Sequence, residues 1–382
     1  MSRLSRVPFS REAAVAAIAG VAAVAVSYAL VGRTPTFVVS PVEGFLSRSM
    51  PGELVTFAIT TVGSLGQQLN LLLATVLVAM AFTAVVRLSL LARTELGGGA
   101  TLLSGILAGL LTFLLSGQTV HTLLVAGAVV AIVGGSELAT AFERGDPLST
   151  KRRRALSTIG GAAGLAVVGY QAGRYEAPSA TAKEAATLQG PNVDRSAIEG
   201  RLAEARQAEV DAEQVGGLVS DRFYNVDING VDPEVDARSW ELSITGAVEQ
   251  EVTYTYDDIR ERPAESRFAA LRCVGEALNG HKMDAALWTG TPIKPLLDEA
   301  SPRSGCGCVM LRGADGYFEE FPLEALEPGF LAYGMNGNVL PRSHGYPARV
   351  LVPGHWGEVN LKWLTEIEIL EQEAEGDWEK RG

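Results

Sequence analysis

The residues best suited to chemistry lie in the second half of the chain, around one cysteine. Cys273 ends the strand-like run 267–273 and enters a loop that contains Gly275. This placement would let its sulfur face a cleft, and a thiolate is a soft metal ligand. Arg272 and His281 would favour the thiolate through their positive potential. A single cysteine at a strand end is more often a small buried apolar residue, so its context decides the interpretation.

A second group of polar residues follows around the rigid turn Val352-Pro353-Gly354. Arginine and lysine bind phosphate, whereas histidine and backbone groups suit a heterocyclic ring. Without further context these would be ordinary surface charges, and a phosphate site is the less common alternative. The members of the group are His344, Arg349, Asn360, Leu361 and Lys362.

The chain carries a series of short motifs in a fixed order. They are AALRCVG (269–275), LWTGTP (287–292), GMNG (334–337), Leu340-Pro341, HGYPAR (344–349), VPG (352–354) and LKW (361–363). This order resembles that of the molybdenum-cofactor domain of the sulfite oxidase superfamily. The resemblance covers about residues 218–372 and implies an α+β domain that binds molybdenum–molybdopterin. It implies that Cys273 is the protein ligand of the metal and the catalytic residue. It adds cofactor contacts at Asp221, Tyr224, Asn225 and Arg312 to the group above.

Three departures from the family pattern limit what the resemblance implies. The stretch Glu276-Ala277-Leu278-Asn279 lacks the basic residue that animal sulfite oxidases place shortly after the cysteine, which puts sulfite itself in doubt. No dimerisation domain and no cytochrome-like domain follow, so we expect a monomeric catalytic unit and a separate electron carrier, linked to haem or quinone. The expected reaction is oxygen-atom transfer to or from a small sulfur compound. Two alternatives stay open: a cofactor-free binding or sensor module on a membrane anchor, and a transporter or receptor.

Charge divides the chain into two halves. Residues 1–174 hold 13 Lys+Arg against 7 Asp+Glu, whereas the remainder holds 19 against 37. So acidic a globular half makes nucleic acid an unlikely partner. It suits either the surface of a halophile's protein or an ordinary acidic protein.

Five apolar stretches in the first half approach the length needed to cross a bilayer as helices. They cover about 13–32, 69–91, 100–116, 120–140 and 155–172, although four or six spans are also compatible with the pattern. Segment 37–64 is only patchily apolar and is expected to be a loop. Three groups of basic residues flank the predicted spans: Arg3–Arg11 before the first, Arg87–Arg93 at the end of the second and Lys151–Arg154 before the fifth. By the positive-inside rule, these three span ends lie on the cytoplasmic side. Five spans would then leave the second half outside the cell membrane.

The basic stretch Lys151–Arg154 also resembles an internal twin-arginine export signal. The alternative is that it only anchors the cytoplasmic end of a helix. His121, the only histidine of the membrane part, is expected to be an interfacial polar residue. The membrane part lacks the paired charges that a transport path requires, which disfavours the transporter alternative.

The expected organisation is a transmembrane anchor (1–174), a partly helical linker without a wide apolar face (175–217), the catalytic domain (218–372) and a tail (373–382). Cys306 and Cys308 are too close in sequence for an unstrained disulfide, and we expect two small residues in a loop or strand. Patterning predicts strands at 240–246, 252–256, 267–273, 308–312, 329–333, 348–352 and 361–370, and helices at 257–260, 293–300 and 322–326. Mixed strands and short helices favour an α+β domain.

Overall fold

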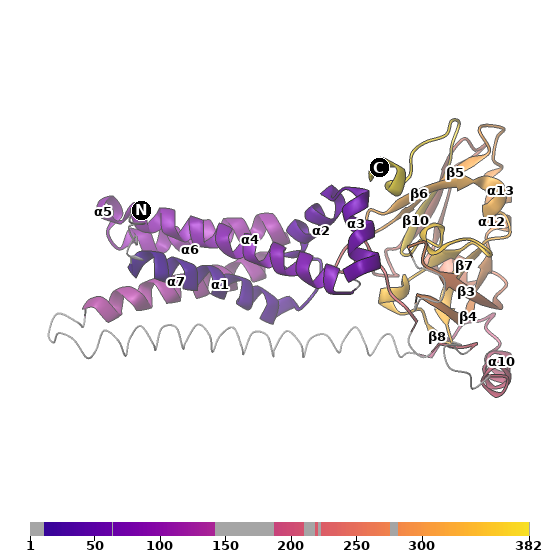
Figure 1. The fold of residues 1–382 in the computed structure, drawn as a ribbon, viewed down its shortest axis with the longest axis horizontal. Coiled ribbons are helices and arrows are strands. Elements are labelled where there is room, and N and C mark those ends of the chain that lie inside the picture. Colours follow the sequence, from indigo (N-terminus) through magenta and orange to yellow (C-terminus); the bar gives the residue numbers. More distant parts are fainter. Residues whose placement is uncertain are drawn as a thin grey trace. The chain divides into compact units, whose positions relative to one another are not determined.

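The computed structural model describes residues 11–62, 64–141, 187–209, 218–220, 223–275 and 282–381. The chain divides into two compact units, one built from the apolar helices and the other from the strand-rich C-terminal half. Figure 1 shows both.

Four of the helices described are long and apolar enough to cross a membrane. They are α1 (Arg11–Val31), α4 (Ser64–Leu91), α6 (Gly99–Ser116) and α7 (Thr119–Ala141). Each coincides with a predicted span. The fifth predicted span, 155–172, and the basic stretch Lys151–Arg154 lie outside the described residues. Among the described residues the structure contains four such helices, against five predicted spans in the whole chain.

The segment expected to be a loop, 37–64, is helical instead. It contains α2 (Ser40–Ser49), α3 (Gly52–Phe57) and the π-helix η1 (Ala58–Val62). Pro41 stands in the first turn of α2 and Pro51 directly before α3. Proline is tolerated at helix starts, where its missing N–H has no intrahelical acceptor to bond. The two prolines therefore begin helices here rather than prevent them.

Two ion pairs connect helices of the bundle. Arg87 of α4 pairs with Glu12 of α1 at 2.6 Å, and Arg93, which starts α5 (Arg93–Leu96), pairs with Glu137 of α7 at 3.3 Å. The pairs therefore join α4 to α1 and α5 to α7. They do not form a charged path across the span.

His121, expected from the sequence to be an interfacial polar residue, stands near the start of α7 and is buried among its neighbours. It is only 4% exposed and starts a stripe on α7 that continues through Val125, Val129 and Val133, each four residues apart. Residues at this spacing share one helix face. The stripe faces the bundle interior, and neither ring nitrogen of His121 has a partner among the described residues.

The C-terminal unit is an α+β domain with two sheets, as predicted. One sheet has the order β2-β1-β10-β5-β6, with only β1 and β10 parallel. Its strands are β1 (Glu241–Gly246), β2 (Val252–Thr255), β5 (Cys308–Gly313), β6 (Phe318–Pro322) and β10 (Leu364–Ile369). The other has the order β3-β4-β7-β8, with β9 also pairing β7. Its strands are β3 (Glu265–Arg272), β4 (Met283–Pro292), β7 (Phe330–Met335), β8 (Asn338–Val339) and β9 (Arg349–Leu351).

Buried and exposed side chains alternate along the strands, and the buried ones form the core. In β1, Leu242 and Ile244 are fully buried between exposed or half-buried neighbours, as expected for a strand with one covered face. They join Ile367 of β10 and Leu311 of β5 in one apolar cluster. A second cluster lies at β3, β4 and β7, where Leu271, Trp288 and Phe330 pack. This second cluster supports the strand end at which Cys273 stands.

Helices close the domain and join its strands. They are α10 (Arg195–Gln207), α11 (Tyr256–Arg260), α12 (Lys294–Ala300), α13 (Leu323–Leu326), α14 (Asp377–Arg381) and the 3-10 turns η3 (Arg342–His344) and η4 (Gly357–Val359). α10 falls in the segment expected to be a linker. It buries Ile198, Leu202 and Ala205 in one cluster with Leu287 of β4, a narrow apolar stripe that the sequence interpretation did not recognise.

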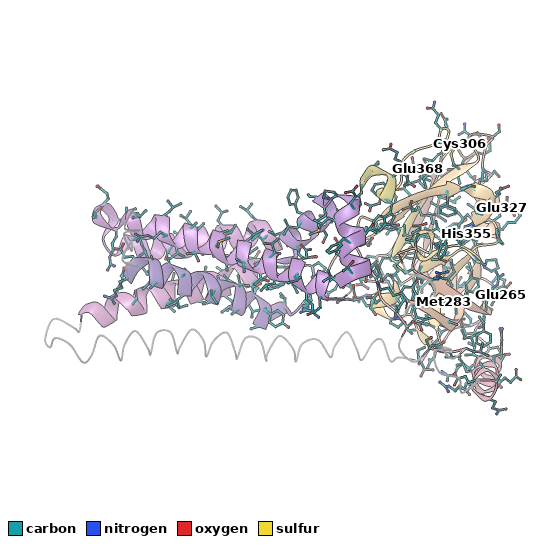
Figure 2. The ribbon with its side chains drawn as sticks, in the orientation of Figure 1. Glu265, Met283, Cys306, Glu327, His355 and Glu368 are labelled. Atoms are coloured by element: carbon teal, nitrogen blue, oxygen red, sulfur yellow. A yellow bond between two sulfur atoms is a disulfide. The ribbon has the colours of Figure 1, made fainter. Side chains whose placement is uncertain are left out.

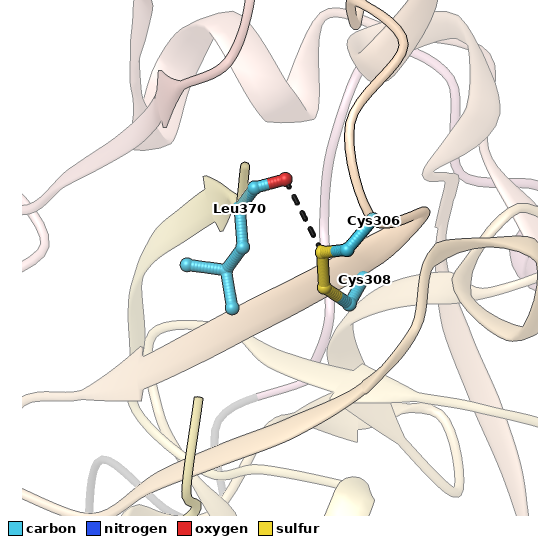
Figure 3. The surroundings of a disulfide bond; sticks show 3 residues. All are labelled: Cys306, Cys308 and Leu370. Carbon is cyan, nitrogen blue, oxygen red and sulfur yellow. Dashed lines mark hydrogen bonds between the residues drawn. A yellow bond between two sulfur atoms is a disulfide. The ribbon is translucent and has the colours of Figure 1, made fainter. Parts of the chain in front are cut away.

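Cys306 and Cys308 form a disulfide, which corrects the expectation from their spacing (Figure 3). Gly307 between them has φ +70°, a left-handed conformation that glycine adopts without strain. The bend brings the two Cα atoms to 5.3 Å, within the ordinary range for a disulfide. Cys306 Sγ also lies 3.4 Å from the carbonyl oxygen of Leu370, just beyond β10.

Candidate active site

Cys273 stands directly after the last residue of β3, at the edge of its sheet. Its backbone N–H donates to the carbonyl oxygen of Lys282 over 3.0 Å, which extends the β3–β4 pairing by one residue. Its thiol forms no disulfide, and the residue is 7% exposed. The strand end therefore fixes the backbone of this cysteine. Its predicted neighbour His281 lies outside the described residues.

One carboxylate fixes the segment that contains Tyr224. Asp284 of β4 accepts hydrogen bonds from Ser220 Oγ and from the Tyr224 backbone N–H, both over 2.6 Å. Burial raises the pKa of the Tyr224 hydroxyl, and the charges of Arg349, Cys273 and Asp284 act on the same group. Tyr224 therefore lies within electrostatic reach of both the cysteine and the arginine. It connects two parts of the predicted site.

Arg349 is the most deeply buried cation of the site, at 4% exposure. Its guanidinium donates to the carbonyl oxygens of His344, over 3.1 Å, and Asn360, over 2.6 Å. It also lies 5.2 Å from the centre of the Trp288 ring. Its Nε atom is buried without a hydrogen-bond partner in the part of the chain that the structure describes. Burial lowers the pKa of Arg349 to about 10, so the group stays charged at neutral pH.

His344 contributes a neutral ring beside this cation. Burial, with added repulsion from Arg349 and Lys362, lowers the pKa of His344 to about 3. Its ring meets that of Phe223 edge to face at 5.5 Å. At neutral pH the imidazole therefore has one donor and one acceptor nitrogen.

Lys362 brings together residues that are far apart in sequence. Its ammonium donates to Asn225 Oδ1 over 2.6 Å and to the Ser343 carbonyl oxygen over 2.8 Å, and it pairs with Asp227. Asp315 is also close. Burial raises the pKa of Asp315 to about 6, with Asp227 raising it further and Lys362 opposing the shift. The predicted pair Asn225 and Lys362 thus meets directly.

Asn360 and Leu361 hold the loop before β10 in place. The Asn360 side chain accepts from the Val352 N–H over 2.7 Å and donates to the carbonyl oxygens of Trp356 and His355. Leu361 is 2% exposed and belongs to the domain core. Gly357 follows Trp356 in the same loop. A Cβ there would stand 2.9 Å from the Tyr224 hydroxyl and 3.1 Å from the Arg272 carbonyl oxygen, so the loop packs closely on the strand end.

Two of the predicted site residues, Arg312 and Asp221, are not seen beside Cys273, Arg349 and Lys362. Arg312 pairs with Glu366 at 3.3 Å and with Glu368 at 2.6 Å across the β5–β10 ladder, so carboxylates already match its charge. Asp315, in the turn after β5, is the residue of this region that reaches Lys362. Asp221 lies outside the described residues.

An anionic heterocyclic cofactor suits the residues that the structure brings together. Arg349 offers a buried, unsatisfied Nε beside its positive charge, which a phosphate or a ring acceptor would satisfy. Neutral His344 offers a hydrogen bond to a ring, and Cys273 offers one soft sulfur. The hydrogen bonds of Arg349 go to uncharged carbonyl oxygens, with Asp227 as a nearby negative charge, and a bound anion would further offset the cost of burying this cation. The donor set therefore fits the predicted molybdenum cofactor.

Sequence reasoning missed three carboxylates of this site. Asp284 holds Ser220 and Tyr224, Asp227 pairs with Lys362, and the charge of Lys362 acts on Asp315. Asp284 follows Met283 in a stretch that was not predicted as a strand. Residues 283–292 show no period-two alternation, so no local signal places Asp284 opposite the end of β3.

Comparisons with known proteins agree with this geometry. Residues 229–378 match the family model described as the oxidoreductase molybdopterin binding domain. Mitochondrial sulfite oxidase of Drosophila melanogaster is 31% identical over 47% of this chain and 36% of that protein. The NADPH nitrate reductase of Fusarium oxysporum is 32% identical over 44% of this chain and 21% of that protein. An uncharacterized oxidoreductase of Bacillus subtilis is 26% identical over 38% of this chain and 73% of that protein.

Among solved structures, the sulfane dehydrogenase SoxCD from Paracoccus pantotrophus matches with a TM-score of 0.36 and 26% identity, over 38% of this chain and 41% of that one. The chain spans 36% of the sulfite oxidase and 21% of the nitrate reductase named above. The match to the family model lies within the C-terminal domain.

Proposed function

We infer the activity of this chain from one premise, that its C-terminal domain belongs to the sulfite oxidase superfamily of molybdopterin-dependent oxidoreductases. We propose that the chain is a membrane-anchored enzyme that transfers an oxygen atom to or from a small sulfur-containing substrate. A separate protein, linked to haem or quinone, would exchange the electrons. The observation that carries the proposal is the buried Arg349 guanidinium, with its unsatisfied Nε, on the same site as Tyr224 and Cys273.

The proposed roles follow from the chemistry of each side chain. Cys273 would bind the metal, while Arg349 and Lys362 would bind the anionic part of the cofactor. His344, neutral at pH 7, would hydrogen-bond to its ring system. The molybdenum cofactor, when bound, supplies the two-electron chemistry and the oxygen exchange of this enzyme class.

The remaining predicted residues fall into two roles. Tyr224 and Asn225 would contact the cofactor from the segment that Asp284 holds. Asn360 and Leu361 would act by positioning the loop that precedes Lys362. For Arg312 we retain only a role in the sheet, because Glu366 and Glu368 already neutralise it.

We further propose that the catalytic domain lies outside the cytoplasm and is exported folded, through the internal twin-arginine stretch. The Cys306–Cys308 disulfide supports this location, because disulfides persist in oxidising compartments. Protease added to intact spheroplasts should remove the C-terminal domain and leave the N-terminus protected. Protection of both ends would refute the proposed orientation.

Turnover assays on the purified, cofactor-loaded full chain test the proposed reaction. Sulfite with an artificial electron acceptor tests the oxidative direction, and dimethyl sulfoxide with a reduced dye tests the other. Activity in either direction would support oxygen-atom transfer. A protein that contains molybdenum but turns over neither class of sulfur compound would refute the substrate proposal.

A cofactor-free sensor on a membrane anchor is the alternative. It would bind small molecules without molybdenum. Stoichiometric metal in the purified chain would exclude it.

A further inference from the structure

The Cys306–Cys308 disulfide has one accessible sulfur atom. Residues 303–307 are all exposed, Cys306 among them, whereas Cys308 is only 3% exposed. Figure 2 labels Cys306 at the periphery of the C-terminal domain. A thiolate breaks a disulfide by attacking one of the two sulfurs, so the rate depends on access to that sulfur. An external thiol can therefore reach this bond at Cys306 and not at Cys308.

Backbone contacts hold the two cysteines in place without the help of the bond. The Leu370 N–H donates to the Cys308 carbonyl oxygen over 3.1 Å, and the Leu323 N–H donates to the Gly307 carbonyl oxygen over 2.8 Å. Cys308 is also the first residue of β5, where it is in register with Pro322 of β6. None of these contacts uses a sulfur atom. They should keep the two side chains together after the bond is reduced.

The loop before β5 lies against the end of β10, which provides an acceptor for the reduced form. A Cβ at Gly305 would stand 2.7 Å from the Leu370 carbonyl oxygen and 3.3 Å from the Glu371 Cα, so the approach requires a residue without a side chain. The same carbonyl oxygen lies 3.4 Å from Cys306 Sγ (Figure 3). Once reduced, the Cys306 thiol can donate to this oxygen.

The bond contributes little to the fold. Cys306 and Cys308 have a sequence separation of only 2, and in the chain-entropy account the stabilisation by a disulfide grows with the loop that it closes. Reduction should therefore leave the domain folded. Exposed disulfides are the ones that exchange readily, whereas structural disulfides of secreted proteins resist reduction. Exposure, a short loop and a fixed backbone together favour exchange over a structural role.

We propose that Cys306 and Cys308 form a thiol–disulfide exchange site for low-molecular-weight thiols. A thiolate R–S⁻ attacks Cys306 Sγ, the Cys306–Cys308 bond breaks, and the electron pair leaves on Cys308 Sγ, which takes up a proton. A second thiolate attacks the R sulfur of the mixed disulfide and releases Cys306 as a thiol. In sum, two R–SH are oxidised to R–S–S–R and the site is reduced by two electrons. The reverse reaction with R–S–S–R restores the bond.

The surroundings of Cys306 suit a small thiol rather than a protein partner. The exposed loop 303–307 reads Arg-Ser-Gly-Cys-Gly and presents no large apolar side chain. Protein interfaces depend on a buried apolar or aromatic centre, which this loop does not provide. A small thiol needs only access to one sulfur.

The first test measures access to the bond in the folded full chain in detergent. Reduced glutathione is the probe, and free thiols are trapped at intervals with N-ethylmaleimide. Trypsin places Cys306 and Cys308 in one peptide, 304–312, and Cys273 in another, 273–282, so mass spectrometry counts the exchange site separately from Cys273. The control is the synthetic peptide 304–312 with its disulfide formed, in which both sulfurs are accessible. Reduction of the folded chain should be within about a hundredfold of the peptide's rate.

Two single variants test which sulfur is attacked. With oxidised glutathione, Cys308→Ser should form a mixed disulfide on the exposed Cys306 at least about tenfold faster than Cys306→Ser forms one on the buried Cys308. Both variants lack the bond equally, so a difference between their rates reports access to the remaining sulfur. Matching thermal unfolding midpoints would show that both are folded.

Reversibility in the parent chain provides a test that needs no variant. After glutathione is removed, oxidised glutathione should restore the bond without denaturant, and tryptophan fluorescence should stay unchanged through the cycle. Reduction slower than the peptide's by more than about a hundredfold, or a bond that re-forms only after denaturation, would overturn the proposal. Equal rates in the two single variants would also overturn it. None of these measurements uses turnover, so their failure would leave the proposed oxygen-atom transfer unaffected.

Discussion

Lys362 Nζ donates a hydrogen bond to Asn225 Oδ1 over 2.6 Å, although 137 residues separate the two in sequence. The contact joins the segment before β1 to the loop before β10. It keeps the ammonium, which also pairs with Asp227, in one orientation. Groups that orient a ligand-binding residue commonly affect binding almost as strongly as the ligand-binding residue itself.

Asn225→Ala should therefore weaken cofactor retention without unfolding the domain. We expect about a tenfold or greater loss of cofactor affinity, in the range seen for orienting partners of metal ligands. Molybdenum content after dialysis measures it. Asn229→Ala is the control, because Asn229 donates to the Asp315 carbonyl oxygen and not to Lys362. Equal molybdenum in both variants would contradict the role of Asn225.

Asn360→Ala should destabilise the domain by leaving the buried Val352 N–H without its acceptor. A buried donor that loses its partner costs about 1–3 kcal/mol. Chemical denaturation of the full chain in detergent measures the change. Asn192→Ala removes side-chain bonds to the carbonyl oxygens of Glu261 and Arg262 at an exposed site and should cost less than half as much. Similar losses in the two variants would contradict the proposed positioning of this loop.

Glu319 should make the stability of the folded domain depend on pH. Burial raises the pKa of Glu319 to about 8, opposed by the hydrogen bond from Tyr317 and increased by Glu379, Glu358 and Asp377. Between pH 4.5 and about 8 the folded state keeps a proton on this carboxyl that the unfolded state has lost. Stability therefore falls as pH rises through this window and levels off above it.

Glu319→Gln removes that titration while keeping an oxygen that can accept from Tyr317. At pH 8 the variant should be more stable than the parent by roughly 2 kcal/mol or more, and at pH 4.5 the two should be nearly equal. Denaturation midpoints across the pH range measure the difference. If the denaturation midpoint of the variant depended on pH in the same way as that of the parent, the result would contradict the burial of this carboxyl.

The Cys306–Cys308 disulfide should leave one free thiol in the chain. Denaturation without reductant, after cofactor removal, should expose Cys273 alone to a thiol reagent, and reductant should raise the count to three. Because the closed loop is so short, Cys306→Ser with Cys308→Ser should cost only about 1–2 kcal/mol. Three reactive thiols before reduction would show that the bond does not form.

Much of the catalytic site could be predicted from sequence order, because its residues stand at strand ends and turns with recognisable local patterns. Cys273, His344, Arg349 and Lys362 were all named this way. Asp227, Asp284 and Asp315 were not, since their roles depend on contacts between distant segments. The carboxylate partners of Arg312 could not be predicted for the same reason, because register alone reveals that Glu366 and Glu368 stand beside it on β10.

In the fold as well, elements with a clear local pattern could be predicted, whereas elements whose burial depends on distant residues could not. Seven predicted strands correspond to β1, β2, β3, β5, β7, β9 and β10, whereas β4, β6 and β8 were not predicted. In β4 the Asp, Ala, Gly and Pro residues weaken the strand pattern. The stripe Ile198, Leu202 and Ala205 on α10 is too narrow to stand out among charged neighbours. Only the presence of Leu287 opposite explains its burial.

Metal analysis of the purified full chain and of Cys273→Ser tests the central claim most directly. The account predicts about one molybdenum per chain in the parent, with an X-ray absorption spectrum that contains a sulfur ligand from the protein. In Cys273→Ser the metal should be lost or bound with one sulfur fewer. A parent chain without molybdenum, or a variant with the same metal content and the same sulfur coordination, would contradict the account.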